Sequence, residues 1–118
     1  MVIRQIADLL SAKVICGEDK LDGVVNSACG CDMMSDVLAF VKDQAVLLTG
    51  LCNPQVVRTA EMMDMRCIVF VRGKIPPSEV VELAKESGIV VMTSNNRMYV
   101  ACGLLYANGL SGGSVLND

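Results

Sequence analysis

Three short apolar runs recur at a constant spacing along this chain. They occupy residues 45–49, 67–71 and 89–93, so each run begins 22 residues after the previous one. Each run is continuous rather than alternating, which is typical of a strand that is buried on both faces. A repeat of this length has room for one strand, one loop and one short helix, so it predicts consecutive βα units with parallel strands.

A helix is expected after each of these strands. The first begins at Asn53 and Pro54, a capping residue followed by proline at the first helical position. The second begins within residues 76–79 and ends at Gly88, and the third follows residues 94–96 and ends at Gly109. The side chains expected to point inward from the first two helices are Val56, Val57, Ala60, Met63, Val80, Leu83 and Ala84. The third helix is expected to run through Met98, Ala101, Cys102 and Leu105.

The N-terminal part is predicted to add two helices and two strands. Apolar spacing indicates a helix over residues 2–10 and another over residues 33–41, with strands at 13–16 and 24–31. Asp32 is predicted to cap the second helix, an interpretation we favour over a metal or acid/base pair with Asp36. The residues expected on the inner face of that helix are Met33, Val37, Phe40 and Val41.

These elements predict an α/β domain whose sheet is mainly parallel, or mixed, with helices flanking it. We expect a single domain over residues 1–110 and a flexible tail over residues 111–118, which are rich in Gly and Ser. Hydrophobic residues make up 53% of the 118 residues, more than one small domain is expected to bury. A homodimer would cover the surplus, so we predict one.

Charge and hydropathy exclude several classes of partner. The net charge of −3 disfavours nucleic acid and anionic membranes, both of which require a basic face. No apolar run approaches the roughly 20 residues that span a bilayer. The first ten residues carry Asp8 and helical spacing, unlike a signal peptide, so we expect a cytoplasmic protein.

The side chains most often used in catalysis and metal binding are sparse. The chain has no histidine, which removes Ser-His-Asp and Cys-His catalysis. Its six cysteines are interpreted as structural thiols. A metal or iron–sulfur site, the less favoured alternative, would need Cys29, Cys31 and either Cys16 or Cys52 close together. We therefore predict no catalytic residues, no cofactor and no metal.

The loops after the three parallel strands are the best candidates for a binding site. Parallel strands place these loops at one edge of the sheet, where open α/β sheets bind ligands. Each loop precedes a helix N-terminus, which favours an anion, and basic side chains add positive charge. A nucleotide or another phosphorylated metabolite would suit this edge. The predicted ligand-binding residues are Thr49, Gly50, Asn53, Arg72, Gly73, Lys74, Thr93, Ser94, Asn95 and Arg97.

The order of these elements resembles the DRTGG domain, a small module related in fold to the N-terminal domain of HPr kinase/phosphorylase. The resemblance covers nearly the whole chain. It rests on the N-terminal helix and strand, residues 30–38, and the strand–loop–helix units at Thr49–Gly50 and residues 71–73. Where the family tends to show Gly-Asp-Arg and Thr-Gly-Gly, this chain has residues 50–52 (Gly-Leu-Cys) and 72–74 (Arg-Gly-Lys).

The resemblance implies a non-catalytic regulatory or accessory module. Stand-alone members occur in anaerobic bacteria beside iron-only hydrogenase components, which implies a redox-enzyme partner. Members fused to other domains occur in regulatory settings and help to form dimers. We therefore expect a module that binds a small anionic ligand. The alternative that stays open is a homodimeric interaction or scaffold module without a small-molecule ligand.

Overall fold

A five-stranded sheet forms the centre of the computed structural model, which describes residues 1–40 and 44–113. The strands lie in the spatial order β1-β5-β4-β3-β2. Neighbouring strands from β2 to β5 are parallel, and β1 is antiparallel to β5. The predicted α/β fold with a mainly parallel sheet is therefore confirmed, with one antiparallel strand at its edge. The strand bounds are β1 Lys13–Cys16, β2 Ser27–Gly30, β3 Ala45–Thr49, β4 Cys67–Phe70 and β5 Val90–Thr93.

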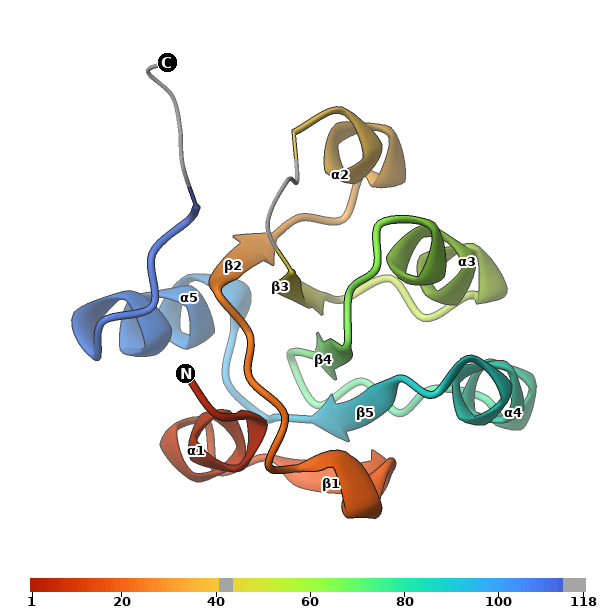
Figure 1. The fold of residues 1–118 in the computed structure, drawn as a ribbon, viewed down its shortest axis with the longest axis horizontal. Helices are drawn as coiled ribbons and strands as arrows, with labels where there is room; N and C mark the ends of the chain where they lie inside the picture. The colour runs from red at the N-terminus through yellow and green to blue at the C-terminus, as the bar shows by residue number, and fades with distance from the viewer. Residues whose placement is uncertain (41–43, 114–118) are drawn as a thin grey trace.

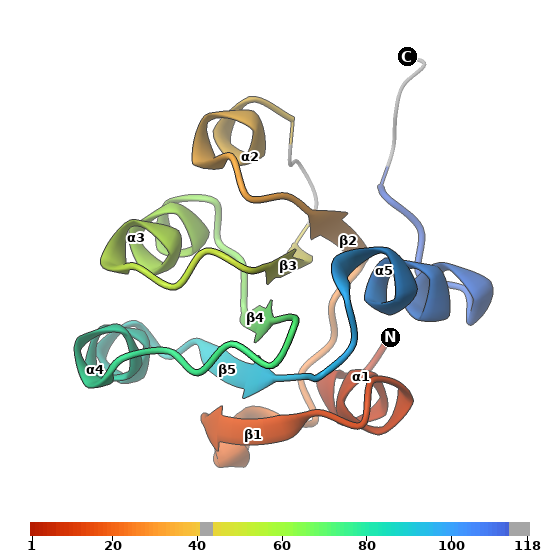
Figure 2. The same ribbon diagram turned by 180° about the vertical axis from the view of Figure 1, so that it is seen from behind.

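Helices cover both faces of this sheet. The helices that connect the parallel strands, α2, α3 and α4, lie on one face, and α1 and α5 lie on the other (Figures 1 and 2). None of the helices in the described ranges is long and apolar enough to cross a membrane. The helical bounds are α1 Ile3–Leu9, η1 (a 3₁₀ turn) Glu18–Lys20, α2 Met34–Phe40, α3 Pro54–Met62, α4 Ser78–Ser87 and α5 Met98–Ala107.

The continuous apolar strands feed two separate cores. Successive side chains of a strand point to opposite faces, so Leu47 packs toward α2–α4 while Val46 and Leu48 pack toward α1 and α5. Phe70 joins the first core and Ile6 the second, and both side chains are fully buried. This two-sided burial explains why the strands show no polar alternation.

Local signals in the sequence act at helix ends as predicted. The Asn53 side chain accepts a hydrogen bond from the N–H of Val56 at 3.3 Å and caps α3, with Pro54 at the first helical position. Gly88 ends α4 in the left-handed conformation, with φ of 71°. Gly17, which follows β1, has φ of 87° and lies against the backbone of Val90.

The start of α2 differs from the prediction in two ways. Met34 rather than Met33 lies in the core with Val37, and Met33 is 60% exposed. The helix begins at Met34, one residue later than expected, so Met33 lies outside it and does not share its buried face. The prediction that Asp32 caps this helix is also wrong, because α2 begins at Met34 and the carboxylate accepts hydrogen bonds from Thr49 at the end of β3 and from Gly50 after it. The Phe40 side chain, Val41 and residues 114–118 lie outside what the structure describes.

Candidate functional site

The loops that follow β3, β4 and β5 meet at one edge of the sheet, as their parallel order requires. The N–H of Arg72 donates to the carbonyl of Asn96 at 2.8 Å, and the N–H of Gly73 donates to the carbonyl of Ser94 at 2.9 Å. The loop after β4 is thus fixed by its backbone to the loop after β5. This arrangement holds the Arg72 main chain in a defined place.

Arg72 occupies an unusual backbone conformation and lies over a glycine. Its φ is 61°, in the left-handed region that costs a non-glycine residue about 1–2 kcal/mol. Its guanidinium lies over Gly50, at the end of β3: a Cβ added there would be only 2.6 Å from the guanidinium carbon. A side chain at position 50 would therefore force the guanidinium away. Strained residues of this kind concentrate at functional sites.

The carboxylate of Asp32 accepts two hydrogen bonds beside Arg72. Its Oδ1 accepts from the hydroxyl of Thr49 and from the N–H of Gly50, both at 2.8 Å. Its Oδ2 lies 3.8 Å from a guanidinium nitrogen of Arg72. Asp32 follows β2, the neighbour of β3 in the sheet, which brings it to this edge. We call Asp32, Thr49, Gly50, Arg72 and Lys74 the strand-end site.

The pKa of Asp32 reports how well these donors hold an anion. The N–H of Gly50 makes the largest contribution in lowering the pKa of this carboxyl below its ordinary value, although partial burial opposes it. The hydroxyl of Thr49 and the charges of Arg72 and Lys74 also lower the pKa. Each of these groups stabilises negative charge. The strand-end site is therefore chemically suited to an anionic oxygen.

Other predicted ligand residues are engaged in holding the loops together. The hydroxyl of Thr93 donates to the carbonyl of Lys74 at 2.7 Å. The buried hydroxyl of Ser94 donates to the carbonyl of Leu10 at 2.8 Å, and the amide of Asn96 donates to the same carbonyl at 3.0 Å. These bonds fix the end of α1 to the loop after β5. Their donors are therefore already used within the fold.

The remaining predicted residues have different surroundings. Asn53 caps α3, and the side-chain oxygen of Asn95 lies beside Gly73. Lys74 is exposed. Arg97 is exposed just before α5, and its side chain makes no hydrogen bond or ion pair among residues 1–40 and 44–113. The structure thus places Arg72 and Lys74 beside Gly73, and within the described residues no hydrogen bond or ion pair of its side chain joins Arg97 to them.

Sequence reasoning missed Asp32 as a member of this site. Its position before a predicted helix made a cap the simplest interpretation, because Asp is a favoured capping residue. The signal that could have found it is its place directly after a strand adjacent to β3. A short polar side chain there points at the same edge as the loop beginning at Gly50.

The cysteines are free thiols placed mainly in apolar surroundings. Burial is the main cause that raises the pKa of Cys29 to about 11, and nearby Cys31 adds to it. Burial likewise raises the pKa of Cys67 well above its ordinary value. Within the described part of the chain, no three His, Cys, Asp or Glu side chains are grouped so that they could hold a metal ion.

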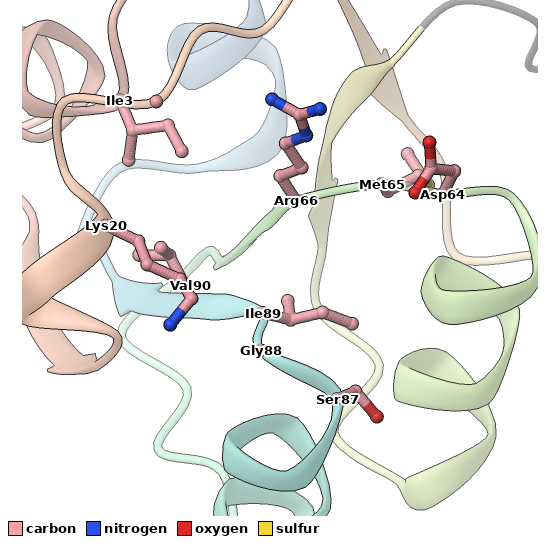
Figure 3. A pocket seen from close by; sticks show the side chains of 10 residues that line it. Ile3, Lys20, Asp64, Met65, Arg66, Ser87, Gly88, Ile89 and Val90 are labelled. Carbon is pink, nitrogen blue, oxygen red and sulfur yellow. The ribbon is translucent and has the colours of Figure 1, made fainter.

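Two cavities lie away from the strand-end site. One of about 140 Å³ lies between β2 and α5, beside Cys102. The other, of about 440 Å³, lies at the opposite edge of the sheet, where β4 and β5 begin (Figure 3). Neither is lined by any of the ten predicted ligand residues.

Comparison with known proteins identifies the family. The family model of the DRTGG domain matches residues 5–106. This chain belongs to the DRTGG domain family. A solved structure with the same fold contains the CBS and DRTGG domains of the regulatory region of Clostridium perfringens pyrophosphatase, complexed with the activator diadenosine tetraphosphate. It is 18% identical, with a TM-score of 0.70.

The match covers 98% of the present chain and 52% of the pyrophosphatase chain, so the present chain spans about half the length of that one. No curated protein sequence matches the domain. The resemblance predicted from the order of elements is confirmed at the level of the family and its fold.

Proposed function

We propose that this DRTGG domain is a non-catalytic regulatory module that binds a small anionic ligand, of the nucleotide class, at the strand-end site. One observation carries the proposal. The hydroxyl of Thr49 and the N–H of Gly50 already hold an anionic oxygen, that of Asp32, beside the guanidinium of Arg72. Donors arranged for a carboxylate oxygen are equally suited to a phosphate oxygen.

The charge and shape of the site favour phosphate over a neutral ligand. Arg72 and Lys74 supply two positive charges against the single carboxylate of Asp32. The guanidinium can make two parallel hydrogen bonds to phosphate oxygens, and Lys74 can add a point charge. Gly50 and Gly73 leave the backbone uncovered by side chains of their own. A phosphate can therefore pair with Arg72 beside Asp32 or displace the Asp32 carboxylate.

The regulatory role is supported by the family and by its structural neighbour. The pyrophosphatase region of the same fold is described as regulatory and as complexed with a nucleotide activator. At 18% identity this likeness concerns the fold, so the ligand and its position in the present domain rest on the strand-end site.

The test is binding of nucleotides and phosphorylated metabolites to the pure protein and to Arg72→Gly. This variant removes the guanidinium and also relieves the left-handed strain at position 72, so loss of stability cannot explain loss of binding. A ligand at a hundredfold excess over its Kd raises the free energy of unfolding by about 2.7 kcal/mol. We expect that gain in the wild type and a much smaller one in Arg72→Gly.

The control is Arg58→Gln, at an exposed position of α3. Glutamine is used there rather than glycine, because glycine inside a helix would lower its stability. It removes the same charge from a residue outside the three loops. Binding that survives in Arg72→Gly, or is lost equally in Arg58→Gln, would refute a ligand at the strand-end site.

A homodimeric interaction module is the second candidate function. It is favoured by α5, which carries no charged residue between Met98 and Ala107. Tyr99 and Tyr106 on this helix are 88% and 74% exposed. Large exposed aromatic side chains are enriched at interfaces. A redox enzyme, including a hydrogenase, is the partner that we propose such a module would serve.

Sedimentation tests this second candidate. A dimer would have about twice the monomer mass of 12.6 kDa, and Tyr106→Arg should return it to the monomer. Tyr106→Phe is the matched control, because it keeps the aromatic surface. A wild-type mass of 12.6 kDa at micromolar concentration would exclude the dimer.

A further inference from the structure

Each of the loops that follow β2, β3 and β4 places an apolar residue directly after a residue of the strand-end site. We call these three residues the apolar border: Met33, Leu51 and Ile75. Met33 is 60% exposed and Ile75 is 70% exposed, while Leu51 is partly buried against the first core. The apolar border therefore leaves apolar surface uncovered next to the charged groups of the site.

The contacts within the strand-end site bring these three loops together. The Oδ1 atom of Asp32 accepts from the N–H of Gly50 at 2.8 Å, and its Oδ2 atom lies 3.8 Å from the guanidinium of Arg72. Because β2, β3 and β4 are neighbours in the sheet, their ends together span only about 10 Å. A ligand that is paired with Arg72 is therefore within reach of the apolar border.

The apolar border lies on one side of the strand-end site. The loops after β2, β3 and β4 lead into α2, α3 and α4, which cover one face of the sheet, whereas the loop after β5 leads to α5 on the other face (Figures 1 and 2). The loop after β5 is polar and contains Asn95, Asn96 and Arg97. The site thus has a polar side toward α5 and an apolar side toward α2–α4.

The segments on the apolar side carry no charge of their own. None of residues 33–35, 51–57 and 75–78 is charged. Three of them are prolines, which lack an N–H donor: Pro54, Pro76 and Pro77. Such surroundings do not attract a second anion. They suit a flat uncharged ring, which packs well against aliphatic side chains and against the thioether of methionine.

The cations of the site lie close to this side. Burial raises the pKa of the Cys52 thiol, and the charges of Lys74 and Arg72 oppose this rise, so both cations are near the loop after β3. Lys74 is also the neighbour of Ile75 in the chain. A phosphate paired with Arg72 and Lys74 therefore places the rest of its molecule beside the apolar border.

We propose that the strand-end site recognises a nucleoside phosphate through its base, which lies on the apolar border while the phosphates pair with Arg72 and Lys74. This inference rests on the function proposed for the site and adds the part that selects the ligand. Met33 and Ile75 are then specificity residues, because they favour a phosphate ester with a flat ring over an inorganic polyphosphate.

The experiment is calorimetric titration of the pure protein with ATP and with inorganic triphosphate, at low ionic strength and without divalent cations. Inorganic triphosphate has the same three phosphate groups and at least as much negative charge, but it has no base. The charges of the site alone would therefore bind it at least as tightly as ATP. Because ATP also buries its base on apolar surface, we expect ATP to bind at least about tenfold more tightly.

Variants then assign the contact with the base. Met33→Gln and Ile75→Gln replace exposed apolar side chains and should each weaken ATP about fivefold, while the affinity for inorganic triphosphate stays the same. Met62→Gln is the matched control. Met62 is 73% exposed at the far end of α3, so the same chemical change there should leave both affinities unchanged.

The outcomes separate this inference from the function on which it rests. Equal affinities for ATP and inorganic triphosphate would overturn the apolar border and leave an anion site at the strand ends. ATP binding that Met33→Gln and Ile75→Gln weaken no more than Met62→Gln, or equal weakening of both probes, would overturn it as well. Absence of binding by both probes at millimolar concentration would overturn the proposed function together with the inference.

Discussion

Substitution of Asp32 by Asn should make an anionic ligand bind more tightly while it makes the fold slightly less stable. Asn keeps a side-chain oxygen that can accept from Thr49 and Gly50, but it removes the negative charge that a ligand phosphate meets beside Arg72. Tighter ligand binding together with lower stability is the result expected if the Asp32 carboxylate occupies the place of a ligand anion.

The magnitude follows from the exposure of the pair. The side chains of Asp32 and Arg72 are 48% and 42% exposed, so the local dielectric is closer to that of water than to that of a protein interior. A phosphate about 4 Å from the carboxylate is then repelled by about 1 kcal/mol. Removing that repulsion should tighten binding about fivefold. Removing the negative charge from the acceptor of these two hydrogen bonds should lower the free energy of unfolding by about 0.5–1 kcal/mol.

The assay is calorimetric titration with ATP at low ionic strength and without divalent cations, together with urea unfolding. Asp36→Asn, in the first turn of α2, is the control and should leave ATP binding unchanged. Unchanged or weaker ATP binding in Asp32→Asn would refute the reasoning. Such a result would mean that the carboxylate is part of the ligand contacts or lies away from the ligand.

The same variant gives a pH dependence with a defined sign. Because the pKa of Asp32 is lowered in the folded state, its contribution to stability is present above the ordinary pKa of about 3.9. That contribution is lost as the pH falls through the folded-state value. The unfolding free energies of wild type and Asp32→Asn should therefore differ at neutral pH and converge in acid.

Three further predictions concern the frame that holds the sites. Ser94→Ala should lower the free energy of unfolding by about 1–2 kcal/mol in urea titrations, because its buried hydroxyl donates to the carbonyl of Leu10 at the end of α1. Asn95→Ala, at an exposed position, is the control and should change this free energy by less than about 0.5 kcal/mol. Gly17→Ala should lower the free energy of unfolding by about 2–4 kcal/mol, because its φ is 87° and a Cβ would lie 2.8 Å from the backbone of β5. Gly103→Ala in α5 is the control: its Cβ would meet no atom within 4 Å, so it should raise the free energy of unfolding by about 0.5–1 kcal/mol. Cys29 should resist alkylation near pH 8, because its pKa of about 11 leaves little thiolate, and mass spectrometry should find it modified faster as the pH rises; rapid labelling of native protein at pH 8 would contradict this.

Much of the fold could be predicted because its strongest signals are local. The apolar runs identify β3, β4 and β5, since a strand buried on both faces has no room for polar residues. Asn53 and Gly88 mark helix ends through their own side-chain or backbone chemistry. Such signals do not depend on which elements become neighbours, so one sequence is enough to find them.

The sites could be predicted only in part because they depend on distant neighbours. The loops after parallel strands were expected to meet, and the backbone bonds of Arg72 and Gly73 join two of them. The bond from Gly50 to Asp32 depends on the order of β2 and β3 in the sheet, which the sequence pattern leaves open. The cavity of about 440 Å³ where β4 and β5 begin depends on how η1 lies beside the end of α4, and no local signal predicts that packing.

The pairing of the first strand with the last bears on how this chain folds during synthesis. Lys13 of β1 lies opposite Thr93 of β5, and the bond between Ser94 and Leu10 spans 84 residues. At about 5–20 residues per second, a ribosome needs on the order of 10 s to supply the partner strand. Throughout that interval α1 and β1 lack their native support, and contacts of such long range slow folding. The N-terminal segment is therefore the part of this protein that we expect to depend most on protection by chaperones before it folds.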